Sequence, residues 1–107
     1  MAYTHDWSGR PVNITSSQLV RIENRRLALA EIVRTIARPL LVVDSYHRSH
    51  ASDGMRLVAC RDTATAGGAC YLRAAIDYSP SSGNYLVGTF TSSTATKPYE
   101  HVVWKAI

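Results

Sequence analysis

The apolar positions of the chain change their spacing near Pro39. Residues 15–38 repeat their apolar residues with the period of an α-helix, whereas later stretches alternate between apolar and polar residues as strands do. This pattern predicts an α+β fold in which one long N-terminal amphipathic helix packs on a four- to five-stranded antiparallel meander sheet. We expect a single domain (1–107) made of a leader (1–14), the helix (15–38) and the sheet (40–107).

The predicted helix has clear signals at both ends and one irregular position. Thr15 and Gln18 have the spacing of a capping box, in which side chains satisfy the free backbone N–H groups at a helix start. Pro39 disfavours helical backbone at the residue before it, so the helix should end at Arg38. Arg26 projects into the middle of the apolar side. It indicates a local bend, a stem packed on the core, or an arginine presented to a substrate or partner.

The alternation of the strands assigns their side chains to two faces of the sheet. One face should lie under the helix, with Gly88 leaving room for close approach. We expect this core face to contain Leu72, Ile76, Leu86, Phe90, Val102 and Trp104. We expect the open face to present Tyr71, Arg73, Tyr85, Thr89, Thr91, His101 and Lys105. Because one helix covers only one side of a sheet, the open face is the place to look for function.

The chain is mildly basic, with 12 Lys and Arg against 8 Asp and Glu in 107 residues and a formal net charge of +4. Only Lys97 and Lys105 are lysines; the other cations are arginines, whose planar guanidinium holds phosphate or carboxylate with two hydrogen bonds. The composition therefore suits an acidic partner, either nucleic acid or protein. A GC-rich genome would give the same arginine bias through its codons.

No apolar run approaches the length of about 20 residues that a membrane-spanning helix needs. Residues 1–7 lack the basic start and apolar stretch of a signal peptide, so we expect a cytoplasmic protein without a membrane partner. In that reducing compartment Cys60 and Cys70 should be buried free thiols. A hairpin that turned symmetrically about Thr65 would instead bring them close enough for a disulfide.

Histidine, arginine and tyrosine on the open face and in the loop before the second strand would suit metal-free cleavage of RNA. A histidine can exchange protons near neutral pH, and an arginine can stabilise a charged phosphorane. For such an enzyme the candidate catalytic residues are His47, His50, His101 and Arg73. The candidate binding residues are Arg48, Arg61, Tyr71, Arg73, Tyr85, Thr89 and Lys105. No phosphate-binding, zinc-protease or nucleophile-elbow motif occurs, and we expect neither a metal nor a cofactor.

Three functions therefore stay open. The sequence favours a small basic binding or interaction protein whose open face binds nucleic acid or an acidic protein. The same face would serve a homo-oligomer, because Val87 and Val103 next to Tyr85 should form an apolar patch there. The alternative is a metal-free ribonuclease or toxin-like domain with a histidine acid and base and an arginine clamp.

Overall fold

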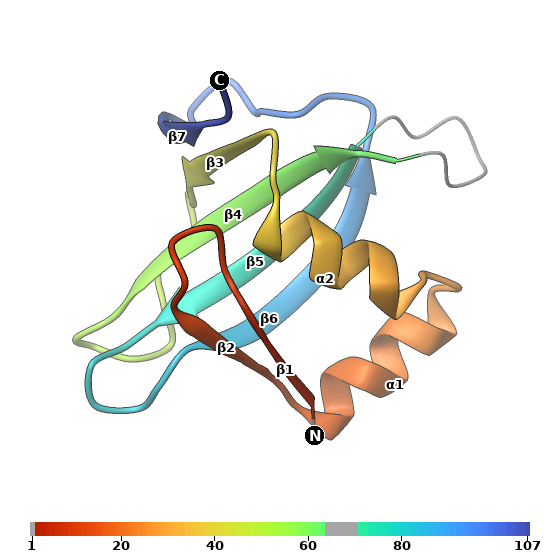
Figure 1. Ribbon diagram of the computed structural model, residues 1–107. Helices are drawn as coiled ribbons and strands as arrows, with labels where there is room; N and C mark the ends of the chain where they lie inside the picture. The colour runs from red at the N-terminus through yellow and green to blue at the C-terminus, as the bar shows by residue number, and fades with distance from the viewer. Residues whose placement is uncertain (1, 64–70) are drawn as a thin grey trace.

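The computed structural model describes residues 2–63 and 71–107, which form two helices and a single mixed sheet of seven strands (Figure 1). In chain order the elements are β1 (Ala2–His5), β2 (Pro11–Ile14), α1 (Ser16–Asn24), α2 (Leu29–Ala37), β3 (Leu41–Asp44), β4 (Met55–Asp62), β5 (Tyr71–Tyr78), β6 (Tyr85–Ser92) and β7 (Val102–Lys105). The α+β class is as predicted. The predicted single long helix and the four- to five-stranded antiparallel meander are wrong.

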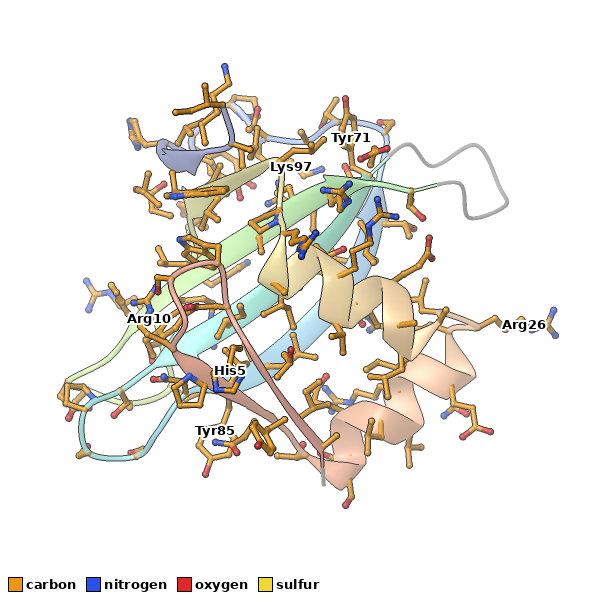
Figure 2. All side chains as sticks on the ribbon, in the orientation of Figure 1. His5, Arg10, Arg26, Tyr71, Tyr85 and Lys97 are labelled. Carbon is orange, nitrogen blue, oxygen red and sulfur yellow. The ribbon has the colours of Figure 1, made fainter. Side chains whose placement is uncertain are left out.

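The helical region forms two helices because the chain turns at Arg26. Thr15 caps α1 as predicted, since its hydroxyl accepts a hydrogen bond from the Gln18 backbone N–H (3.4 Å). At the other end the Leu27 N–H donates to the Ile22 carbonyl (3.0 Å), and Arg26 has a φ of 56°. This is the Schellman arrangement, which ends a helix with one residue in the left-handed region. Arg26 therefore marks a local bend, and its side chain points into solvent (Figure 2).

The predicted leader is a β-hairpin that covers part of the sheet. β1 and β2 pair antiparallel, and β2 meets β6 in parallel through one register pair, Asn13 with Tyr85. The hairpin and both helices lie on the same side of β4, β5 and β6, toward the viewer in Figure 1. Val12 and Ile14 of β2 are fully buried there. The sequence pattern missed this hairpin because a four-residue strand offers too few positions to establish alternation.

Asp6 and Trp7 attach the turn of the hairpin to the sheet through contacts with side chains of β5 and β7. The Asp6 carboxylate accepts hydrogen bonds from Arg10 Nε (2.8 Å) and from the Tyr78 hydroxyl (2.7 Å). Burial raises the pKa of Asp6, but the hydrogen bonds it accepts, led by that from Tyr78, outweigh burial and leave the pKa below its ordinary value. The Trp7 ring packs edge-on against Tyr78, and its centroid lies 6.1 Å from that of Trp104 in β7. The turn thus reaches the strand at the opposite edge of the sheet.

The strand order is β1-β2-β6-β5-β4-β3-β7, so the last strand does not follow β6 in space. The chain leaves β6 at Ser92 and returns to the far edge, where β7 pairs antiparallel with β3. Residues 93–101, here called the strap, pass over the face that the helices leave open and contact Arg73 and Cys60 there (blue in Figure 1). A meander is the simplest connection for such short strands, and their turn signals do not distinguish it from a crossover.

A β-bulge in β6 changes which of its side chains face the helices. The pairing of β6 with β5 shifts register between Leu86 and Gly88, which leaves Val87 as an extra residue. An extra residue reverses the alternation of the strand beyond it. Phe90 therefore lies on the open face and Thr89 is buried on the helix face, the reverse of the prediction for both.

The main core lies between the sheet and the layer formed by the helices and the hairpin. Its buried aliphatic side chains include Val12, Ile14, Ile22, Ile32, Ile36, Val42, Leu57, Leu72, Ile76 and Leu86. The core predictions for Leu72, Ile76 and Leu86 are thus confirmed. Those for Phe90, Val102 and Trp104 are wrong, because these side chains are 37%, 50% and 36% exposed. The bulge places Phe90 on the opposite face of the sheet, and β7 is an edge strand that the helices do not cover.

Candidate binding site on the open face

The open face is hollowed between the strap and the loop that follows β3. We call this cavity the hollow; its volume is about 300 Å³. Its apolar floor consists of Val58, Ala75, Val87 and Gly88. Its walls include Tyr46, His47, Lys97, Tyr99 and Glu100. Arg56, Arg73 and Phe90 complete the lining. The site therefore combines an apolar base, aromatic rings and several cations.

The bulge in β6 creates the floor. It places two successive residues, Val87 and Gly88, along the hollow, and Gly88 pairs with the small residue Ala75. A Cβ at Gly88 would meet no atom within 4 Å, so the absence of a side chain there leaves open space. The prediction that Gly88 lets the helix approach is wrong. Gly88 lies on the other face, where it deepens the hollow.

Arg73 lines the hollow beneath the strap. Its side chain is 2% exposed and forms an ion pair with Glu100 of the strap, which is 4% exposed. Its Nη1 donates to the Ala95 carbonyl and to the Cys60 sulfur (3.7 Å). Its Nε–H is buried without a hydrogen-bond partner in the described part of the chain. Arg73 is thus a charge-compensated group with one unused donor, whereas the sequence led us to expect an exposed clamp.

Further hydrogen bonds hold the strap in place. The Cys60 thiol donates to the Ala95 carbonyl (3.2 Å), and the Lys97 backbone N–H donates to Glu100 Oε1 (2.7 Å). Burial raises the pKa of Cys60 to about 11, although the charge of Arg73 acts in the opposite direction. The thiol therefore stays protonated at neutral pH and keeps its donor. These contacts hold the strap, which forms one wall of the hollow, against strands β4 and β5.

Tyr46 and Tyr99 form an exposed aromatic pair at the mouth of the hollow. Their ring centroids lie 4.9 Å apart, and their side chains are 71% and 58% exposed. The His47 ring packs edge-on against Tyr46. The Lys97 ammonium donates to the Ser92 hydroxyl (3.1 Å) and makes no ion pair within residues 2–63 and 71–107. Exposed rings beside an uncompensated cation suit a ligand that is both planar and anionic.

A second ion pair joins the loop after β3 to the sheet. Arg56 Nε donates to Asp77 Oδ1 (2.6 Å), and the same carboxylate accepts from the His50 backbone N–H (2.9 Å). Burial raises the pKa of Asp77, but the hydrogen bonds from Arg56 and His50 and the charge of Arg56 together leave it below its ordinary value. Asp77 is therefore ionised at neutral pH, and it positions Arg56 along the hollow.

The predicted proton-transfer histidines are placed separately. His47 lines the hollow. The Nδ1 atom of His50 lies 3.2 Å from Asp77 Oδ2, and that of His101 lies 3.5 Å from Asp44 Oδ2. Among the described contacts, none joins two of these histidines. The three histidines thus lie in separate contacts and are not grouped at the hollow.

The two tyrosines predicted to stack bases lie at opposite ends of the sheet. Tyr71 pairs with Ser92, whereas Tyr85 pairs with Asp77. The two positions lie six residue steps apart along β5, which corresponds to about 20 Å. The aromatic pair at the mouth of the hollow comes instead from two loops.

The other predicted binding residues are dispersed. Arg61 Nη1 donates to the Arg38 carbonyl (2.6 Å) at the end of α2, a favourable place for a cation. Arg48 is exposed in the loop after β3, and Lys105 is exposed on β7. Thr89 is buried on the helix face.

Sequence reasoning missed Lys97, Tyr99 and the role of Gly88 in this site. Lys97 and Tyr99 lie in the strap, after a Ser/Thr-rich run whose composition alone predicts only a loop. A cation and an aromatic residue two positions apart in such a loop are a signal for binding that could have been used. The role of Gly88 depends on the register in which β6 pairs with β5, and the residue pattern does not predict that register.

No group of three or more His, Cys, Asp or Glu residues in the described ranges is placed to hold a metal ion. Cys60 lies opposite Arg73, so the hairpin is not symmetric about Thr65. The alternative disulfide to Cys70 involves a residue outside those described. Within the same ranges, no helix has both the length and the apolarity that crossing a bilayer requires.

In comparisons with known proteins, no family model, no curated protein and no solved structure matches this chain.

Proposed function

We propose that the protein is a non-catalytic binding protein whose open face holds single-stranded nucleic acid at the mouth of the hollow. The observation that carries this proposal is the exposed Tyr46–Tyr99 pair with the ammonium of Lys97 on the same wall. Proteins that bind single strands combine aromatic rings, on which bases stack, with cations that follow the phosphates. An acidic protein would use the cations but has no general need for two exposed rings.

The charge distribution supports the same choice. Arg48 and Lys105 flank the open face and, like Lys97, make no ion pair among the described residues. The net charge of +4 favours a polyanion over a neutral partner. Arg56 and Arg73 add little to this attraction because Asp77 and Glu100 compensate them. The affinity should therefore be moderate and should fall as salt is added.

Fluorescence anisotropy with a labelled single-stranded oligouridylate tests the proposal. Tyr46→Ala and Tyr99→Ala should each weaken binding about five-fold or more, because one stacked base contributes about 1–3 kcal/mol. Tyr3→Ala is the matched control, since Tyr3 is also exposed (67%) but lies on β1. Equal affinities for all three variants, or no binding of the oligonucleotide by the wild type, would overturn the proposal.

Metal-free RNA cleavage remains the alternative for the same face. His47 is the histidine that lines the hollow, and cleavage would need a second proton-transfer group near it. Incubating labelled RNA with the wild type and with His47→Ala separates the two functions. Binding alone predicts intact RNA in both samples, whereas cleavage that disappears in His47→Ala would establish the enzyme.

The edge strand β7 favours self-association as a second candidate. Val102 and Val103 are 50% and 53% exposed on this strand. The patch expected from Val87 and Val103 is not continuous, because β5, β4 and β3 lie between their strands. Light scattering over a range of concentrations tests this candidate. A dimer that Val102→Arg dissociates would support it, and a monomer at all concentrations would exclude it.

A further inference from the structure

The hollow contains a buried donor that nothing in the described chain satisfies. Arg73 is 2% exposed, and its Nε–H has no hydrogen-bond partner, although its other nitrogens are occupied by Glu100, Ala95 and Cys60. Leaving a buried donor unpaired is costly, and native structures rarely do so without a reason. Arg73 lines the hollow, and surrounding protein atoms cover its Nε–H, so a ligand there supplies the missing acceptor once those side chains shift slightly.

The charge around Arg73 indicates the kind of acceptor. Glu100 already compensates the guanidinium and is itself 4% exposed. A second anion placed beside Arg73 would be repelled by this carboxylate and would lose its hydration. A neutral carbonyl oxygen would satisfy the Nε–H without either penalty. The anionic group of the ligand is better held at the wall by Lys97, whose ammonium has no carboxylate partner among the described residues.

The form of the hollow indicates a flat, compact group. Its volume of about 300 Å³ is at the lower end for small-molecule sites. Its floor is apolar, with Val87 and Gly88 beneath the space, and Phe90 adds an aromatic ring to the lining. A single planar ring with a carbonyl on its edge matches this lining, with its phosphate near Lys97.

We propose that the hollow selects one carbonyl-bearing base, with uracil the simplest case, from the single strand that is bound at its mouth. The Arg73 Nε–H donates to the base carbonyl, and the ring lies over Val87 and Gly88. Adenine fits less well because it is a larger, two-ring base, and its acceptors are ring nitrogens rather than a carbonyl oxygen that projects from the ring edge. This inference rests on the proposed function and adds a preference among bases to it.

Gly88 provides the variant for the test, because changing it fills the hollow without touching Arg73. A side chain at this position starts in open space, with no atom within 4 Å of its Cβ. Gly88→Leu should therefore fold and should occupy the space of the base. Gly88→Ala is the matched control, since it changes the same backbone position with a minimal side chain.

The experiment compares labelled oligouridylate and oligoadenylate of equal length by anisotropy, with the wild type and both Gly88 variants. The wild type should bind oligouridylate about ten-fold more tightly, as expected when one base places a carbonyl oxygen on the Arg73 donor and the larger base does not fit there. Gly88→Leu should lose this preference and keep its affinity for oligoadenylate, while Gly88→Ala should keep most of the preference. A preference that arises from the oligonucleotides themselves would persist in all three proteins. A change in the affinity ratio between the proteins therefore reports the contribution of the hollow.

Two results would overturn the inference, and they differ from each other. If both strands bind and Gly88→Leu leaves their affinity ratio unchanged, the hollow does not select a base, although the proposed function stands. If neither strand binds the wild type, the proposed function fails and the inference fails with it. Arg73→Lys gives a second check, because it keeps a cation for Glu100 but removes the Nε–H. In a folded Arg73→Lys protein the preference should fall while binding of oligoadenylate is retained.

Discussion

Replacing Arg26 with glycine should stabilise the fold. Arg26 is exposed, makes no hydrogen bond through its side chain among the described contacts, and holds a φ of 56° between the two helices. Side chains other than glycine are strained in this region because the Cβ crowds the following carbonyl. Glycine is the usual residue at this position of a Schellman turn.

The size of the effect follows from two opposing contributions. Relief of the left-handed backbone is worth about 1–2 kcal/mol for a residue with a Cβ. Glycine also stabilises the unfolded chain by about 0.5–1 kcal/mol, because it gives that chain more conformational freedom, and this offsets part of the gain. The net increase in the free energy of unfolding is therefore between about 0 and 1.5 kcal/mol, with a central value of about 0.75 kcal/mol. In a domain of this size 1 kcal/mol corresponds to about 4–8 °C in Tm.

Urea unfolding followed by circular dichroism measures this change. Arg26→Gly should raise the midpoint without altering the slope, which would indicate a more stable but unchanged fold. Arg34→Gly is the matched control, because it removes the same charge from an exposed site inside α2. There glycine should cost up to about 1 kcal/mol. If both variants lose stability equally, residues 16–37 form a continuous helix in solution and the turn at Arg26 is wrong.

The remaining predictions concern buried contacts. Glu100→Leu should lower the free energy of unfolding in urea by about 3–5 kcal/mol, because it leaves Arg73 buried without its counter-ion, and adding Arg73→Met should restore most of the loss. Failure of the double variant to recover would contradict this account. Asp6 has a lowered pKa, so its contribution to stability is present above the ordinary value of 3.8 and is lost as the pH falls through the folded-state value. Asp6→Asn should therefore flatten the acid limb of a plot of Tm against pH, and an unchanged limb would refute the role of Asp6. Gly54→Ala should cost about 1–3 kcal/mol, because its Cβ would lie 2.7 Å from the Tyr78 carbonyl oxygen; an unchanged Tm would show that this backbone can move apart.

Local signals in the sequence were sufficient where the structure depends on neighbouring residues. Thr15 starts a helix because its hydroxyl accepts from a backbone N–H three residues on. The end before Pro39 follows from the proline ring itself. Arg26 is irregular in the apolar pattern, but the helical periodicity continues on both sides of it and predicts one helix. A single left-handed residue costs too little to be visible in a pattern of apolar positions.

The site could not be predicted because it depends on long-range pairing. The register shift at Val87 exchanges the faces of all later residues in β6, so Phe90 and Thr89 were assigned to the wrong sides. The crossing of the strap brings Glu100 to Arg73. The residues that flank each of them in the sequence do not predict this ion pair. Tyr46 and Tyr99 likewise meet only because the two loops lie on the same face.

The strap also gives the protein an order of assembly during its synthesis. Because chains are made from the N-terminus, the hairpin, both helices and strands β3 to β6 leave the ribosome before residues 93–101. Until Glu100 arrives, Arg73 has no counter-ion, and the hollow lacks the wall that carries Lys97 and Tyr99. A chain whose main core has packed before the strap docks is therefore still without a complete hollow. In the proposed function, a ligand bound in the hollow would therefore report that the strap has docked.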